Sequence, residues 1–123
     1  MKNRTLGQSF TTAWTGIRES FGEERNVRIH GWAVLAVIIL GLWLEIDLLR
    51  WALLALACGA VLATELLNTA LERLTDMVTS ELCEEARQVK DMAAGAVLVS
   101  ALFAAAAGLA VFAGPLLRKL GWI

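Results

Sequence analysis

The sequence is poor in the residues from which common metal and nucleotide sites are built. It has one histidine, His30, and two cysteines, Cys58 and Cys83, which form no CxxC pair. A structural zinc site takes four cysteine or histidine ligands, and the chain has only three such residues. The sequence therefore excludes a structural zinc site of this kind. The sequence also contains neither a GxxxxGK[ST] phosphate-binding loop nor a kinase-type GxGxxG motif. Any nucleotide site must therefore be of a different kind.

The sequence also lacks a large net charge, and it shows no sign of a boundary between domains. The formal net charge is −1, which gives no global basic field of the kind that attracts nucleic acid. The sequence has one proline, Pro115, and shows no internal repeat or low-complexity linker. A chain of 123 residues accommodates one domain at most, so we treat residues 1–123 as a single domain. The polar first 30 residues predict no cleavable signal peptide.

Apolar residues dominate the remainder. They make up 58% of the chain, against roughly 45–50% in soluble domains. Their distribution predicts three membrane helices, over residues 29–46, 51–72 and 92–117, the last without any charge. Trp32 and Trp43 lie near the ends of the first, as interfacial tryptophans do. We therefore expect an all-α integral membrane protein, too small to enclose a large site alone and hence oligomeric.

The N-terminal residues have a different pattern. Leu6, Phe10, Trp14 and Ile17 recur at helical spacing, which predicts an amphipathic helix over residues 1–28 on the membrane surface. Residues 73–90 are expected to form a polar connection. Together these two segments carry eight lysines and arginines, against three on the opposite side. This bias predicts a cytoplasmic N-terminus.

A stripe of polar residues interrupts the apolar pattern within segment 63–76. Glu65, Asn68, Glu72 and Asp76 fall within an arc of about 80° on a helix and extend along it for about 16 Å. The stripe begins where the chain should still lie inside a bilayer. An ionisable residue at such a depth is costly and indicates a functional site. For Glu72 and Asp76 a solvated helix end is the alternative interpretation.

The residue types of the stripe suit particular chemistry. Carboxylates with an amide and a lysine favour a hard cation, and Mg²⁺ typically takes one or two carboxylates plus phosphate oxygens. Apolar surroundings disfavour the charged form of a carboxylate and make it a stronger base. Glu65 could thus accept a proton from a lipid hydroxyl, Glu72 hold the metal and Lys90 neutralise phosphate. A proton- or ion-coupled carrier would also place carboxylates in a membrane.

Three segments carry a family resemblance, namely SFTTAWTGIRESFGEERNVRIH, ELLNTALERLTD and KDMAAGAVLV. In order and spacing they resemble the small bacterial integral-membrane lipid kinases, the family of diacylglycerol kinase and undecaprenol kinase. The resemblance covers residues 9–99. It implies a homotrimer with active sites shared between subunits, located in the bacterial plasma (inner) membrane. It also implies ATP- and Mg²⁺-dependent phosphorylation of a lipid alcohol.

The resemblance further implies roles for individual residues. Glu65 corresponds to the catalytic base, and Glu24 and Glu72 to the ligands of Mg²⁺. The implied nucleotide-binding positions are Thr12, Glu24, Asn68, Glu72, Asp76, Glu81, Leu82, Cys83, Lys90 and Asp91. The implied lipid-binding positions are Asn26, Arg28, His30, Glu65 and Ala94. Cys83 stands where the family often has histidine, and Arg4 is one residue away from a common arginine position.

The lipid substrate is predicted from one small residue. The diacylglycerol branch typically reads KDMGSAAV, whereas this chain reads KDMAAGAV, with Ala94 in place of a serine. This resembles the undecaprenol kinase branch and predicts undecaprenol as substrate. Diacylglycerol, phosphorylated by the same mechanism, is the alternative. A non-enzymatic carrier or assembly protein is the alternative of another class, but a carrier needs a polar path that the uncharged segment 92–117 does not provide.

Overall fold

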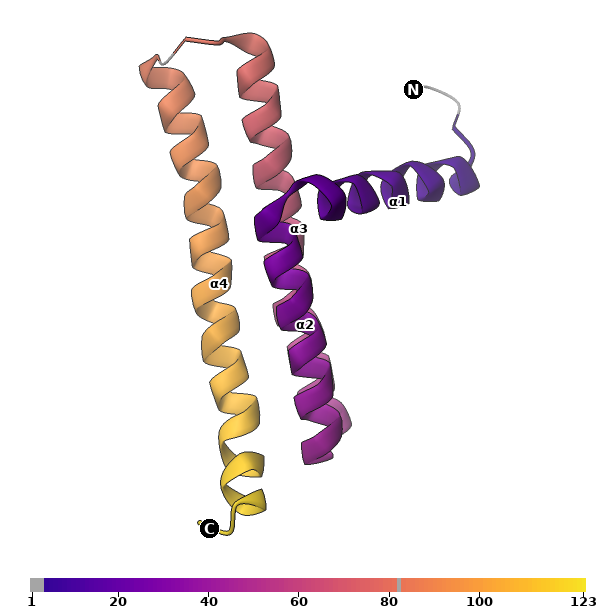
Figure 1. The fold of residues 1–123 in the computed structure, drawn as a ribbon, viewed down its shortest axis with the longest axis vertical. Helices are drawn as coiled ribbons and strands as arrows, with labels where there is room; N and C mark the ends of the chain where they lie inside the picture. The colour runs from indigo at the N-terminus through magenta and orange to yellow at the C-terminus, as the bar shows by residue number, and fades with distance from the viewer. Residues whose placement is uncertain (1–3, 82) are drawn as a thin grey trace.

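In the computed structural model, the described residues 4–81 and 83–123 form four helices. They are α1 (Leu6–Glu23), α2 (Arg25–Leu44), α3 (Leu48–Val78) and α4 (Glu84–Lys119). The last three run alongside one another, while α1 projects sideways from them (Figure 1). Each of α2, α3 and α4 is long and apolar enough to cross a membrane. The predicted all-α architecture with three membrane helices is confirmed to this extent.

The first helix ends earlier than the sequence pattern suggested. Thr5 caps its start, because the Thr5 hydroxyl oxygen accepts a hydrogen bond from the backbone N–H of Gln8. Its end is Glu24, whose extended backbone (φ −104°, ψ 118°) redirects the chain. The predicted helix over residues 1–28 is therefore wrong at its C-terminal end, since residues 25–28 begin α2. Its first three residues lie outside the part described.

Two glycines allow neighbouring helices to approach closely. A Cβ atom at Gly31 of α2 would lie 2.5 Å from a ring carbon of Phe21, so glycine lets the end of α1 pack against α2. A Cβ atom at Gly41 would lie 2.5 Å from the indole of Trp51 on α3. Between α2 and α3 the chain turns through Glu45, which has left-handed backbone geometry (φ 52°, ψ 49°). The predicted spans 29–46 and 51–72 are thus shifted to Arg25–Leu44 and Leu48–Val78.

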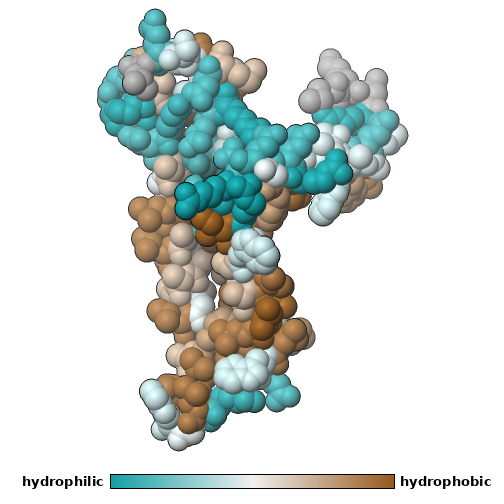
Figure 2. All heavy atoms as spheres, in the orientation of Figure 1, coloured by the Kyte–Doolittle hydropathy of each residue, from teal (hydrophilic) through white to brown (hydrophobic). Residues whose placement is uncertain are grey.

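The predicted polar connection over residues 73–90 is mostly helical. α3 continues to Val78 and α4 begins at Glu84, well before the predicted start at residue 92. Polar composition does not end a helix, and this segment contains neither proline nor glycine. An ion-pair ladder of Arg87 with Glu84 and with Asp91 supports the first turns of α4. As a result, α3 and α4 carry their polar residues beyond the apolar part of the bundle (Figure 2).

The helices are packed loosely. α4 contacts mainly α3, and few residues of α2 approach α4. A small core of Ile46, Leu54 and Val111 forms near the turn between α2 and α3. Large apolar side chains such as Trp32, Leu56 and Phe103 remain exposed. These faces suit lipid or further protein, because a water-soluble chain would bury them.

Candidate active site

A buried carboxylate on α3 is the central feature of the site. Glu65 is 4% exposed although it lies in a helix long and apolar enough to cross a membrane. The Nε2 atom of His30, on α2, lies 3.0 Å from Oε1 of Glu65. His30 keeps 25% of its side chain exposed. The structure thus brings together two predicted site residues that are 35 positions apart in the sequence.

Asn68 and Glu72 follow Glu65 along the same face of α3. Nδ2 of Asn68 donates a hydrogen bond of 3.3 Å to Oε1 of Glu72. Asn68 is only 9% exposed, and its Oδ1 atom has no hydrogen-bond partner among the described residues. A buried amide oxygen without a donor is costly. Oδ1 of Asn68 is therefore available to a donor supplied by a ligand or by another copy of the chain.

Glu24 is connected to α3 by a hydrogen bond from Arg73. Nη2 of Arg73, on α3, donates to Oε2 of Glu23 at 2.7 Å and to Oε1 of Glu24 at 3.1 Å. This contact places the junction of α1 and α2 beside α3, one residue after Glu72. The two predicted magnesium ligands thus lie on adjoining elements. Among the described residues, however, no group of three or more metal-ligating side chains is assembled.

A second cluster lies where α3 and α4 pass beyond the apolar part of the bundle. Nζ of Lys90 donates to Oδ1 of Asp76 at 2.6 Å, and this bond raises the pKa of the Lys90 ammonium, so that it stays protonated at neutral pH. The pair borders a hollow of about 150 Å³ that Glu81, Arg87 and Asp91 also line. Four predicted nucleotide-binding positions therefore share one polar hollow between α3 and α4.

The other predicted positions are more dispersed. Thr12 is exposed on α1, where its hydroxyl donates to the Gln8 carbonyl of the same helix. Arg28 donates to the carbonyls of Phe21 and Gly22 and so fixes the bend between α1 and α2. The structure also places Asn26 at the exposed start of α2, Cys83 at the N-cap of α4 and Ala94 exposed on α4. Leu82 lies outside the described residues.

Two arginines of the site were not predicted to take part in it. In the sequence, Arg73 and Arg87 count only among the positive charges that predict the orientation of the chain. Arg87 stands four residues before Asp91, and this spacing does indicate an ion pair within one helix. Arg73 contacts residues 49 and 50 positions away, and nothing in the sequence signals that contact. Arg73 reaches Glu23 and Glu24 because the chain bends at Glu24.

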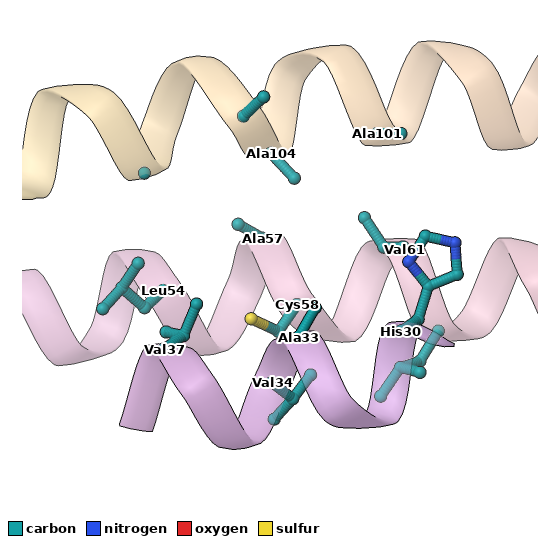
Figure 3. A pocket seen from close by; sticks show the side chains of 13 residues that line it. His30, Ala33, Val34, Val37, Leu54, Ala57, Cys58, Val61, Ala101 and Ala104 are labelled. Carbon is teal, nitrogen blue, oxygen red and sulfur yellow. The ribbon is translucent and has the colours of Figure 1, made fainter. Parts of the chain in front are cut away.

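An apolar groove leads toward the buried pair. It has a volume of about 200 Å³ and is lined by α2, α3 and α4. Figure 3 shows His30 beside Val61 at one end of the lining side chains and Val37 beside Leu54 toward the other. Alanines 101, 104 and 105 form much of the wall contributed by α4. The groove therefore offers small apolar side chains, with an imidazole at one end.

The carboxylates of Glu24 and Glu72 are of the ligand type that Mg²⁺ prefers. Mg²⁺ prefers oxygen ligands and is commonly held by one or two carboxylates together with substrate phosphates. Glu24 and Glu72 each have one carboxylate oxygen bonded to a protein side chain, Arg73 and Asn68 respectively. Two carboxylates suit an ion whose coordination phosphate oxygens complete. Chemically, the arrangement offers a buried carboxylate in contact with an imidazole, two carboxylates of the ligand type that Mg²⁺ prefers, and a protonated lysine.

Comparison with known proteins gives consistent matches. The model of the prokaryotic diacylglycerol kinase family matches residues 11–112. The chain is 39% identical over 105 residues to the undecaprenol kinase of Bacillus subtilis, covering 85% of each protein. It is 41% identical over 113 residues to the diacylglycerol kinase of a Synechocystis species, covering 91% of this chain and 65% of that relative. It is 34% identical over 109 residues to the diacylglycerol kinase of Escherichia coli, covering 85% of this chain and 89% of that relative.

Proposed function

We propose, from the premise that this chain belongs to the prokaryotic diacylglycerol kinase family, that it phosphorylates the hydroxyl group of undecaprenol. Membership makes the chain a membrane lipid kinase with ATP as phosphoryl donor. The observation that carries the proposal is the buried Glu65 in a membrane helix, hydrogen-bonded to His30. A carboxylate there has a large desolvation cost, and a role as general base accounts for it.

The proposed reaction is an in-line phosphoryl transfer. The lipid hydroxyl oxygen forms a bond to the γ-phosphorus of ATP while its proton passes to the carboxylate of Glu65. The bond between the γ-phosphorus and the bridging oxygen breaks, and ADP leaves with that electron pair. Because phosphoryl transfer depends on positioning and electrostatic stabilisation, the remaining polar residues serve to hold the phosphates.

The metal and nucleotide positions follow the two clusters of the site. We propose that Glu24 and Glu72 hold Mg²⁺, which when bound neutralises charge on the phosphate oxygens. Lys90 supplies a donor to the phosphates, and Asn68 completes the nucleotide site. The other proposed nucleotide positions are Thr12, Asp76, Glu81, Leu82, Cys83 and Asp91. Besides Glu65, the proposed lipid positions are Asn26, Arg28 and Ala94, while His30, which the resemblance places near the lipid, contacts Glu65.

The chain is proposed to act as a homotrimer in the bacterial inner membrane, with its N-terminus in the cytoplasm and α1 on the membrane surface. Three observations support an assembly: the unpartnered Oδ1 of Asn68, the loose packing between α2 and α4, and the exposed apolar faces. The crosswise direction of α1 and its exposed Leu6, Phe10 and Trp14 suit a helix lying on the bilayer (Figure 1).

Undecaprenol is favoured over diacylglycerol by Ala94. This residue is exposed on α4, one position after the buried Ala93, and it offers no hydroxyl to a headgroup. A substrate with a single terminal alcohol requires fewer polar contacts than one with a glycerol backbone. Diacylglycerol remains the second candidate, since two of the relatives compared above are diacylglycerol kinases.

The test is transfer of labelled γ-phosphate from ATP in mixed micelles that contain undecaprenol or diacylglycerol. We expect a higher kcat/KM with undecaprenol and loss of turnover in Glu65→Gln by a factor of about 10² or more. ATP binding should be largely retained in this variant, because the change removes a base and no nucleotide contact. Absence of lipid-dependent phosphate transfer in the folded wild type would contradict the kinase proposal. Faster transfer to diacylglycerol would contradict the assignment of the lipid.

A further inference from the structure

We propose that His30 is a positioning residue, which binds one oxygen of Glu65 and directs the other toward the lipid hydroxyl. The inference deepens the proposed function and rests on it, because it assigns the orientation of the base and not the reaction itself. It differs from the expectation that His30 contacts the lipid headgroup. The two roles have different kinetic consequences, so experiment can separate them.

The contact has the geometry of a directed hydrogen bond. Nε2 of His30 lies 3.0 Å from Oε1 of Glu65, within the range of an N–H···O bond. A carboxylate that acts as a base is ionised and can only accept hydrogen bonds, so the proposed role requires the hydrogen on Nε2 of His30. The carboxylate side chain is 5% exposed, against 25% for the imidazole. Water therefore has little access to the carboxylate, and the imidazole supplies a donor in its place.

A hydrogen bond from His30 to one oxygen of Glu65 fixes the direction of the other oxygen. Without it, the carboxylate can rotate about its last bond, and neither oxygen has a fixed direction. With Oε1 bonded to His30, the proton acceptor toward the substrate is Oε2. Because proton transfer requires a partner within hydrogen-bond reach in the reactive geometry, fixing this rotation raises the share of productive encounters.

The location of His30 connects the base with the apolar groove. His30 lines the groove of about 200 Å³ between α2, α3 and α4, beside Val61 (Figure 3). Its α2 helix thus holds the imidazole between an apolar wall and the carboxylate of α3. A lipid whose chain lies along this wall presents its terminal hydroxyl close to the pair. The imidazole can therefore orient Glu65 without itself forming a bond to phosphate or to the lipid oxygen.

Three substitutions separate this role from others. In His30→Gln the side-chain amide nitrogen takes the place of Nε2, so the donor to Glu65 is kept. In His30→Asn the amide takes the place of Nδ1 and cannot reach the carboxylate, although it is equally polar. His30→Phe keeps a ring in the groove without any donor. The measurements are kcat and KM for lipid and for ATP in mixed micelles. Size-exclusion elution and thermal unfolding of each purified variant control for folding.

The expected result is a selective loss of kcat. His30→Asn and His30→Phe should lower kcat by about 10- to 100-fold, while KM for the lipid and for ATP changes less than about 2-fold. His30→Gln should retain kcat within about 5-fold of wild type. This rescue by a variant that keeps the donor distinguishes orientation of Glu65 from a merely structural role of the ring.

Other outcomes overturn the inference. An unchanged kcat in folded His30→Phe would show that Glu65 needs no donor from residue 30. A large rise in the lipid KM with kcat retained would assign His30 to headgroup binding instead. Equal losses in His30→Gln and His30→Asn would exclude donation from the Nε2 position. In each case the wild-type enzyme still phosphorylates lipid, whereas failure of the proposed function would remove activity from the wild type itself.

Discussion

Nε of Arg50 donates a hydrogen bond of 3.2 Å to the backbone carbonyl of Val111. Val111 lies four residues before Pro115, which is inside α4 and has no N–H to complete the helical bond to that carbonyl. Arg50 belongs to α3 and is held by Asp47, whose Oδ2 accepts from Nη1 at 2.9 Å. The arginine thus satisfies an acceptor that the proline leaves open, and it ties α3 to α4 at the end remote from Glu65.

The first prediction concerns this tie. Arg50→Met should lower the free energy of unfolding by about 1–3 kcal/mol, because the Val111 carbonyl loses its donor in an apolar setting. Pro115→Ala restores the helical donor, so the same arginine substitution should cost less in the Pro115→Ala background. Thermal or denaturant unfolding in detergent micelles measures all four variants of the cycle. Equal costs of Arg50→Met in both backgrounds would refute the coupling.

The second prediction concerns the metal. Glu72→Gln should raise the Mg²⁺ concentration required for half-maximal activity by about 10-fold or more, since it removes one charged oxygen ligand. The glutamine oxygen can still accept the hydrogen bond from Asn68, so the fold should be preserved. A magnesium titration of lipid phosphorylation measures the effect. Glu19→Gln, an exposed change on α1, serves as the control. An unchanged titration in Glu72→Gln would remove Glu72 from the metal site.

The third prediction separates stability from nucleotide binding at Lys90. The pair with Asp76 is exposed, at 37% for the lysine side chain and 64% for the aspartate, so its loss should change the free energy of unfolding little. Lys90→Met should nevertheless raise KM for ATP by about 10-fold, because a protonated donor to phosphate disappears. Arg87→Met removes another positive charge that lines the same hollow and serves as the control. If it raises KM for ATP as much as Lys90→Met does, the effect is not specific to the Lys90 ammonium.

Helical periodicity predicted most of the fold. The apolar stretches located α2, α3 and α4, and the stripe from Glu65 to Asp76 lies on the single helix α3, as its spacing indicated. Where the helices end was predicted less well. The sequence predicts a polar connection over residues 73–90, yet residues 73–78 and 84–90 are helical, because a polar composition does not by itself end a helix.

The site was predictable where its residues share one helix and unpredictable where helices meet. The bond between Asn68 and Glu72 follows from a spacing of four residues. The contacts of His30 with Glu65 and of Arg73 with Glu24 depend on how α2 and the bend at Glu24 sit against α3. Such contacts depend on tertiary packing, which the spacing and periodicity of residues along the chain do not reveal.

The last prediction concerns the choice of lipid at Ala94. Ala94→Ser restores the hydroxyl that the diacylglycerol branch resemblance places there, on an exposed face of α4. The ratio of kcat/KM for diacylglycerol to that for undecaprenol should rise by about 2- to 10-fold, because one added hydrogen-bonding group is worth about 1 kcal/mol. Ala96→Ser is the matched control, since this residue is also exposed but points to another side of the helix. Parallel assays of both lipids in mixed micelles give the ratio for each variant. A ratio that responds equally to both substitutions would mean that any hydroxyl on this turn acts alike, and that Ala94 does not mark the substrate.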